Sequence, residues 1–339
     1  MTARHILSIS AALFAVLPVR AEPPLARFEF TEPHMGTQFR IVLYAVDEAT
    51  AKKASRAAFD RVAALDAMMS DYRQSSELMQ LCAKAGGPPV KASEELFFVL
   101  TKAEEASRLS DGAFDVTVGP VVQLWRLSRR TQRLPEPEQL AKARALVGWK
   151  NVVLDPKERT VKLLKPGMLL DLGGIAKGYA GDEAQKVLSS LGVSRALVAG
   201  GGDIVVSGPP PGKEGWEIAI RPLLELEGKA GPRLLLSNAA VSTSGDANQH
   251  VEIDGKRYSH IVDPKTGIGL VGRMSATVVA RDGTTSDSLT KVVAVLGPER
   301  GFKLIETVEG ASARFVRLTE RGEEVSASPR FPKLKAEWP

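Results

Sequence analysis

The chain is 339 residues long, with 44% hydrophobic and 25% charged residues and a formal net charge of +5 at pH 7. This composition is ordinary for a globular protein, and the length is sufficient to bury a full core in one large domain or two. The charge excess is too mild to argue for nucleic acid as a partner.

The first 21 residues have the pattern of a secretory signal peptide. Arg4 supplies a positive charge, an apolar run extends from Ile6 to Val19, and Val19-Arg20-Ala21 forms a cleavage site of the small-x-small type. The apolar run is short for a membrane span, and no cysteine adjoins the cut for lipid attachment. We therefore expect residues 1–21 to be removed, and residues 22–339 to be a periplasmic or otherwise exported soluble protein, not an integral membrane protein.

Cysteine and histidine usage excludes two kinds of site. Cys82 is the only cysteine, so an intramolecular disulfide is impossible and a small core residue is the favoured interpretation. The histidines of the mature chain, at positions 34, 250 and 260, lack the spacing of zinc ligands.

The first half of the mature chain is predicted to be mainly helical. Residues 22–27 are interpreted as a proline-containing tether, and alternating apolar residues over 39–44 predict a strand. Helical spacing follows over 51–69 and 93–109. Residues 126–148 are charged and interrupted by prolines, which favours a surface excursion. The pattern typical of a helix is weak in this segment.

Strands are predicted to dominate from residue 152 onward. Helical patterns interrupt them over 176–191, 287–296 and 299–308, the last two separated by Gly297. The predicted strands are 152–154, 160–164, 196–199, 204–207, 216–220, 234–236, 251–253, 275–280 and 313–318. With no repeat period and no clear linker, we expect a single α+β domain over residues 22–339.

The segment from Leu170 to Ala180 is the most informative stretch. A run that is predicted to be a buried strand (168–170) leads into Asp171 and two glycines, and a helix is predicted from Ala176. A glycine turn into a helix N-terminus gathers backbone N–H groups and the positive end of the helix dipole, which favours an anion. Asp171 and Lys177 add one charge of each sign. An ordinary corner with a solvated lysine explains the pattern about as well.

Four further segments carry polar residues that could form a site. Gly200–Asp203 permits close approach of a ligand, although a tight hairpin explains it nearly as well. Ser242–Asp246 is a hydroxyl-rich turn, and Ser259–Gly267 ends a strand beside a histidine that in isolation is expected to be structural. Thr285–Lys291 opens a helix, where Asp287 is either a complement to the helix dipole or a ligand for a hard cation.

Common nucleotide-binding and hydrolase motifs are not found in the sequence. The residues of these segments and their order along the chain instead resemble the ApbE family of FAD:protein FMN transferases. The resemblance runs from about Met35 to Gly297. The segments that carry it are Met35-Gly36-Thr37, Ser70-Asp71-Tyr72, 112–120, 171–178, Gly201-Gly202-Asp203, Ser242–Gly245 and the His-x-x-Asp-Pro-x-Thr-Gly motif at 260–267.

The resemblance implies a fold and an activity. Family members are similar in having an α+β fold with a core likened to the T-fold, in which mixed sheets are flanked by helices. They are exported, bind FAD with magnesium, and transfer FMN to a threonine or serine hydroxyl of an acceptor protein through a phosphoester bond, releasing AMP. The implied acceptor is a subunit of a membrane redox complex.

The resemblance also implies site residues. The positions that match FAD-binding residues are Met35, Tyr72, Ala113, Phe114, Asp115, Asp171, Lys177, His260 and Val262. The carbonyl of Gly174, the carboxylate of Asp287 and the hydroxyl of Thr290 are the candidate magnesium ligands. His260 and Asp287 are the candidate catalytic residues, and either His260 or Asp263 could act as the general base.

Lys291 departs from the family pattern. The family usually has a metal-binding threonine four residues after the aspartate, whereas here Lys291 holds that position and Thr290 precedes it. A cation there would repel magnesium unless its ammonium points away. Three outcomes are open: Thr290 replaces the usual ligand, Lys291 assumes part of the metal's electrostatic role, or the protein binds FAD without efficient transfer.

Two other functions remain compatible with these residues. With water as the acceptor, the same site would be an FAD pyrophosphatase that yields FMN and AMP. Without turnover, the protein would be a flavin-binding protein.

Overall fold

The computed structural model describes residues 24–223, 231–245 and 250–334. The predicted signal peptide, residues 1–21, lies outside the described residues. Within those ranges, no helix combines the length and the apolar character needed to cross a membrane.

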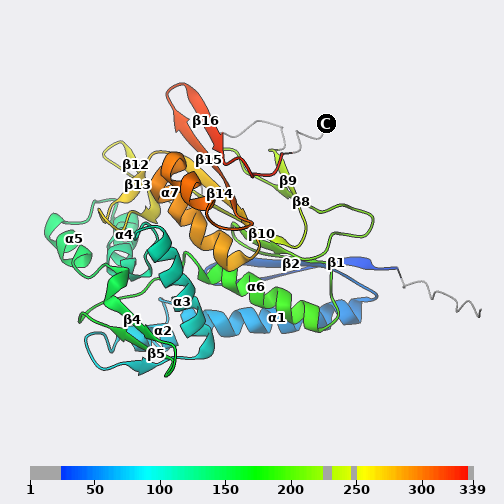
Figure 1. Ribbon diagram of the computed structural model, residues 1–339, viewed down its shortest axis with the longest axis horizontal. Helices are drawn as coiled ribbons and strands as arrows, with labels where there is room; N and C mark the ends of the chain where they lie inside the picture. Colours follow the sequence, from blue (N-terminus) through cyan, green and yellow to red (C-terminus); the bar gives the residue numbers. More distant parts are fainter. Residues whose placement is uncertain (1–23, 224–230, 246–249, 335–339) are drawn as a thin grey trace, which may run out of the picture.

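An eight-stranded antiparallel sheet forms the centre of the molecule (Figure 1). Its strand order is β1-β2-β6-β7-β10-β14-β15-β16, and every neighbouring pair is antiparallel. The strands are β1 (Ala26–His34), β2 (Thr37–Ala45), β6 (Ala196–Gly200), β7 (Asp203–Val206), β10 (Ala239–Gly245), β14 (Met274–Ala280), β15 (Ser312–Thr319) and β16 (Gly322–Ala327).

Three helices cover one face of this sheet: α1 (Glu48–Met69), α6 (Ala176–Ser190) and α7 (Gly283–Ile305). Strand β2 shows why this face is apolar. Phe39, Ile41 and Leu43 are completely buried in the helix-side core, as the period-2 pattern of this segment predicts. The α+β class expected from the sequence is therefore confirmed.

A β-hairpin covers the other face of the sheet. Strands β8 (Trp216–Ala219) and β9 (Arg233–Leu236) contribute Trp216 and Leu234 to a second core. Val42 from β2 joins it, because alternate residues of a strand point to opposite faces. The central strands are thus buried on both sides.

Two smaller groups of elements complete the fold (Figure 1). One contains α4 (Gly119–Thr131), α5 (Pro137–Arg144), β11 (His250–Ile253), β12 (Lys256–Val262) and β13 (Gly269–Val271). The other contains α2 (Glu77–Cys82), α3 (Glu94–Leu109), β3 (Val90–Lys91), β4 (Val152–Asp155), β5 (Thr160–Leu163) and the short 3₁₀ turns η1 (Val116–Val118) and η2 (Trp149–Asn151).

Some local predictions were wrong. Met168 and Leu170 are buried, but residues 168–170 join no sheet; the amide of Leu170 instead donates to the Cys82 sulfur (3.3 Å). Strand β1 begins at Ala26, inside the predicted tether, and residues 242–245 are strand rather than turn. The predicted surface excursion begins within α4, because the buried Trp125 anchors this helix to the Gly267 carbonyl (2.8 Å).

Helices α6 and α7 approach each other through glycine backbones. A Cβ atom added to Gly178 would lie 2.0 Å from the carbonyl oxygen of Gly283, and one added to Gly283 would lie 2.5 Å from that of Gly178. The amide of Gly178 donates to Asp287 Oδ2 across this crossing (3.1 Å). Side chains at either glycine would separate the two helices.

Gly178→Ala tests how closely these helices are packed. Alanine in a helix is ordinarily more stable than glycine by about 1 kcal/mol. Here we expect the opposite sign, a loss of about 2–3 kcal/mol in the free energy of unfolding, because the methyl group meets backbone atoms. Urea unfolding followed by circular dichroism measures this loss. The control Ser189→Ala, at an exposed position of α6, should stay within about 0.5 kcal/mol of wild type; equal midpoints for the two variants would contradict the close crossing.

Candidate functional site

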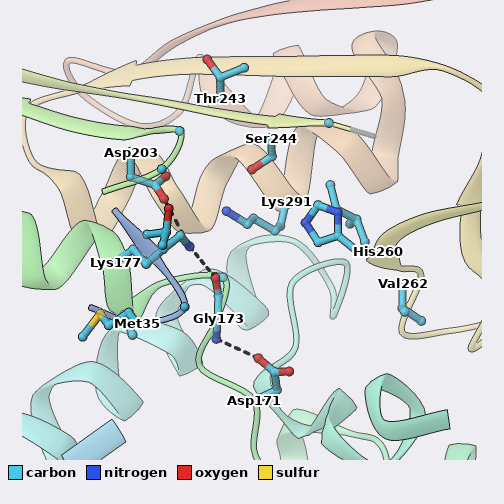
Figure 2. Close-up of a pocket in the computed structure, with 18 of the residues that line it drawn as sticks. Met35, Asp171, Gly173, Lys177, Asp203, Thr243, Ser244, His260, Val262 and Lys291 are labelled. Atoms are coloured by element: carbon cyan, nitrogen blue, oxygen red, sulfur yellow. Dashed lines mark hydrogen bonds and ion pairs between the residues drawn. The ribbon is translucent and has the colours of Figure 1, made fainter. Parts of the chain in front are cut away.

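A cavity of about 720 Å³ lies where the sheet, the helices and the smaller elements meet. Its volume is within the range of small-molecule sites. Ten of the predicted site residues line it although they are spread over more than 200 positions of the chain: Met35, Tyr72, Ala113, Phe114, Asp115, Asp171, Gly174, Lys177, His260 and Val262. Figure 2 shows Met35, Asp171, Lys177, His260 and Val262 around the cavity. Asp287 and Thr290 are fully buried and are not among its lining residues.

Met35 reaches the cavity from the hairpin turn between β1 and β2. His34 pairs with Thr37, so Met35 and Gly36 are the two central residues of the turn. Both have positive φ angles, +50° and +71°, as a type I′ turn requires. Methionine adopts this conformation at a cost that glycine or asparagine would avoid.

Asp171 organises the glycine turn instead of pointing freely at a ligand. Its Oδ1 accepts the amide of Gly173 (2.8 Å), and its Oδ2 accepts Arg126 (3.0 Å). Arg126 also donates to Asp71 (2.5 Å), and its guanidinium lies 4.2 Å from the centre of the Tyr72 ring. This network holds the Tyr72 ring, which is 73% exposed, at the rim of the cavity.

Asp115 is engaged in local structure. Its Oδ1 accepts both the amide and the hydroxyl of Thr117 (2.8 and 2.6 Å), and its Oδ2 accepts the amide of Trp149 (2.8 Å). Burial raises the pKa of this carboxyl group above its usual value. These contacts shape the loop that presents Phe114, and ligand contact by Asp115 stays a prediction.

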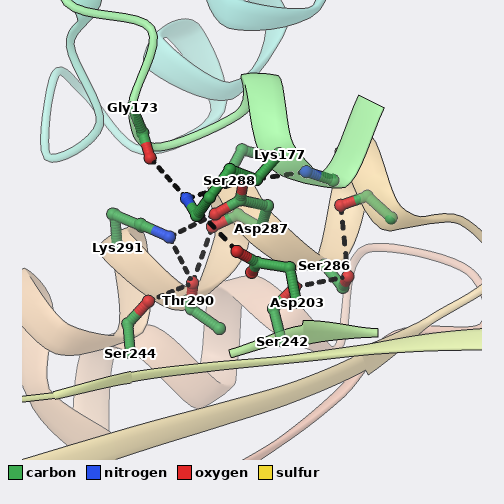
Figure 3. Close-up of polar contacts among 12 residues, drawn as sticks. Gly173, Lys177, Asp203, Ser242, Ser244, Ser286, Asp287, Ser288, Thr290 and Lys291 are labelled. Carbon is green, nitrogen blue, oxygen red and sulfur yellow. Dashed lines mark hydrogen bonds and ion pairs between the residues drawn. The ribbon is translucent and has the colours of Figure 1, made fainter. Parts of the chain in front are cut away.

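Four charges of alternating sign form a connected series beside the cavity: Asp203, Lys177, Asp287 and Lys291, here called the charge chain (Figure 3). The ammonium of Lys177 lies 3.2 Å from Asp203 Oδ2 and 3.7 Å from Asp287 Oδ2, and it donates to the Gly173 carbonyl (2.8 Å). Lys291 forms an ion pair with Asp287 Oδ1. The two lysines line the cavity, with Asp287 buried behind them.

The pKa values of the charge chain follow from burial and pairing. Burial alone would lower the pKa of Lys177, but the carboxylates of Asp203 and Asp287 outweigh it and raise that pKa. Burial would raise the pKa of Asp287, yet Lys177 and Lys291 hold it below its usual value. Burial and then the charge of Asp287 raise the pKa of Asp203. Lys177 is therefore a cation at neutral pH.

Hydroxyl pairs fix α7 against β10. The Ser242 hydroxyl pairs with that of Ser286 (2.8 Å). Two residues further along β10, on the same face of the strand, the Ser244 hydroxyl pairs with that of Thr290 (3.0 Å). The Thr290 hydroxyl also donates to the Asp287 carbonyl (2.6 Å) and accepts from Lys291 (3.3 Å). The hydroxyl-rich segment singled out in the sequence thus sets the depth of α7 beneath the cavity.

Two of the three predicted magnesium ligands, Asp287 and Thr290, are held by protein groups and do not fit a metal ion in this arrangement. Both carboxylate oxygens of Asp287 contact cationic or amide groups of the protein, and Thr290 uses its proton and both lone pairs on protein partners. Within the described ranges, no cluster of three or more His, Cys, Asp or Glu side chains could hold a metal ion. Magnesium prefers six oxygen ligands, and the side chains of Asp287 and Thr290 do not offer theirs while they keep their protein partners.

The two candidate bases differ in position. His260, on β12, lines the cavity. Asp263 accepts the Lys265 amide (2.8 Å) and the Thr266 hydroxyl (3.2 Å), so it closes the turn after β12. The geometry favours His260 for proton transfer in the cavity.

Two charged residues that pair with predicted site residues were not predicted from the sequence to belong to the site. Asp203 follows three glycines, which flagged the segment but not the side chain; its buried Oδ1 has no hydrogen-bond partner among the described residues. Arg126 was placed in a surface excursion, and no local signal indicated that it pairs with Asp71 and Asp171.

Comparisons with known proteins identify the family of this chain. A family model described as the ApbE family matches residues 35–315. The FAD:protein FMN transferase of Klebsiella pneumoniae strain 342 is 31% identical over 305 residues, which cover 89% of this chain and 92% of that protein. That of Haemophilus influenzae is 32% identical over 311 residues, which cover 88% and 89%.

A solved structure shares the fold over nearly all of its length. The flavin transferase ApbE from Vibrio cholerae superimposes with a TM-score of 0.80 at 29% identity, covering 90% of this chain and 98% of that chain. The match of the family model to most of the chain, together with these relatives, shows that the chain belongs to the ApbE family.

Proposed function

We propose that this protein is an FAD:protein FMN transferase that moves FMN from FAD to a threonine or serine hydroxyl of an acceptor protein and releases AMP. The observation that carries the proposal is the cavity of an ApbE-family chain in which Lys177 and Lys291 stand beside the glycine turn. Relatives bearing the name FAD:protein FMN transferase support the reaction.

The cavity residues supply what this transfer requires. The acceptor oxygen attacks the phosphorus on the FMN side, a P–O bond to that phosphate forms, and the bond to the oxygen that leaves with AMP breaks. The ammonium groups of Lys177 and Lys291 stabilise the negative charge that develops on the pyrophosphate. His260 takes the proton of the acceptor hydroxyl.

The ring systems of FAD have aromatic partners at the cavity. Tyr72 is exposed at the rim, with one face covered by Arg126. The other face of its ring is suited to stack on the isoalloxazine or the adenine. Phe114, Met35 and Val262 add apolar surface to the lining.

The proposal includes the cellular context expected from the sequence. Residues 1–21 are removed as a signal peptide, and residues 22–339 act as one exported, periplasmic unit. The acceptor is a subunit of a membrane redox complex that carries the flavinylated threonine or serine.

Transfer is tested by mass spectrometry of an acceptor domain incubated with FAD and residues 22–339. We expect the acceptor to gain the mass of one FMN less one water while AMP appears in equal amount. A Thr→Val change at the modified acceptor position should abolish the gain. AMP without labelled acceptor would identify an FAD pyrophosphatase, and bound FAD with neither product would identify a flavin-binding protein.

Lys177→Met removes one cavity cation while keeping the length of the side chain. We expect FAD affinity to fall about ten- to hundredfold, the loss typical of one charge-assisted contact. Quenching of flavin fluorescence measures the affinity, and thermal unfolding checks that the variant is folded. The matched control is Lys186→Met, on the exposed side of α6, which should bind FAD as wild type does. Equal affinities for the two variants would remove Lys177 from the site.

Tyr72→Ala removes the exposed ring at the rim. We expect FAD affinity to fall about three- to tenfold, as for loss of one aromatic stacking contact, with little change in stability because the side chain is exposed. Tyr72→Phe keeps the ring and should bind FAD nearly as wild type does. If Tyr72→Ala also binds normally, the ring does not stack on the ligand.

A further inference from the structure

Lys291 fills the space between the glycine turn and Asp287. It lies four residues after Asp287 on α7, so both side chains point the same way from the helix. A Cβ atom added to Gly174 would lie 3.5 Å from both Cγ and Cε of Lys291. The aliphatic part of Lys291 therefore passes alongside Gly174, and its ammonium reaches Asp287 (Figure 3).

The oxygen atoms near this ammonium are already occupied by protein groups. Asp287 Oδ2 accepts the Gly178 amide (3.1 Å), and its Oδ1 is paired with Lys291. Thr290 accepts from Lys291 (3.3 Å) while Ser244 holds its other side (3.0 Å). A metal ion at Asp287 would have to displace the lysine.

The charge balance opposes that displacement. Two lysines and two aspartates make the charge chain neutral, and only 16% of the Lys291 side chain is exposed. A divalent cation inserted beside Asp287 would lie within a few ångströms of two ammonium groups with little water to screen them. An ammonium group is itself a compact cation with three donors.

We infer that Lys291 is a built-in replacement for a divalent cation: its ammonium holds the pyrophosphate of FAD, so that this chain binds and uses FAD without metal. The inference rests on the proposed function for its transfer step, whereas its binding step is independent of transfer. Lys291 neither gives nor takes a proton in the transfer step. Its ammonium group stabilises the charge on the leaving phosphate.

The first measurement needs no variant. FAD affinity of residues 22–339 is measured by flavin fluorescence quenching in magnesium and in EDTA. We expect the two dissociation constants to agree within about twofold, far below the tenfold change that corresponds to one lost contact. A tenfold or larger loss in EDTA would overturn the inference.

Two variants then separate charge from metal. Lys291→Met should weaken FAD binding about ten- to hundredfold in both buffers, because the Lys291 ammonium is lost and methionine supplies no ligand for a metal ion such as magnesium in its place. Lys291→Thr frees Asp287 and supplies a hydroxyl, so its affinity should be equally weak in EDTA and recover about tenfold in magnesium. Electron paramagnetic resonance with Mn²⁺ as the probe should detect a bound ion in Lys291→Thr and none in wild type.

Lys303→Thr is the matched control, because it makes the same change at an exposed position of α7. It should bind FAD like wild type in both buffers and bind no Mn²⁺. The inference would be supported if Lys303→Thr bound FAD equally in magnesium and EDTA while Lys291→Thr bound FAD more tightly in magnesium. The inference would be overturned if wild type bound one Mn²⁺ ion and its FAD affinity increased as that site was filled.

The transfer assay distinguishes this inference from the proposed function. Metal-independent FAD binding with no labelled acceptor and no AMP would refute the transferase while leaving Lys291 as the ligand cation. Labelled acceptor that appears only with magnesium would support the transferase and refute the role of Lys291. Labelling that survives EDTA supports both.

Discussion

The pairing of two buried carboxylates with two lysines is the interaction on which the rest of the site depends. Asp203 and Asp287 are almost completely buried, and an unpaired buried charge costs several kcal/mol. Lys177 and Lys291 offset that cost, and both reach their partners from the cavity side. The interactions that make α6 and α7 stable next to each other therefore also deliver positive charge to the place where an anionic ligand would bind.

The close crossing of α6 and α7 determines which anion occupies the helix N-terminus. A glycine turn before a helix suggests that the ligand's phosphate binds the first amides. In this protein the Gly178 amide instead donates to Asp287, an anion of the chain itself. In the function proposed above, the ammonium groups of Lys177 and Lys291 supply the positive charge for the ligand's phosphates. This arrangement differs from a phosphate-binding loop, in which backbone amides contact the phosphate directly.

Local sequence patterns were sufficient for much of the fold. The alternation in β2 and the glycine break at position 297 both identified elements correctly, because each depends only on neighbouring residues. The motifs also located most of the cavity lining, including Met35, Lys177 and His260. These residues could be located because the motifs occur in the same order along the chain as in a known family.

Patterns could not predict pairings between distant segments. Arg126 meets Asp71 and Asp171 across 55 and 45 residues, and nothing in its own helix indicates a carboxylate partner. The magnesium ligands were inferred one position at a time. Whether Asp287 faces a metal or an ammonium depends on the path of Lys291 past Gly174, which is a property of the packed structure. The apolar side chains of Met168 and Leu170 are buried, but burial does not require a sheet.

The left-handed conformation of Met35 places stability and ligand recognition in opposition at one residue. Asparagine or glycine at this position would relax the β1–β2 turn by about 1 kcal/mol. Either would also remove a large apolar side chain from the cavity wall. The positive φ of Met35 is a local cost of folding at a residue that lines the cavity, and in the function proposed above contact with the ligand offsets that cost. Efforts to make the protein more heat-resistant should leave this turn unchanged.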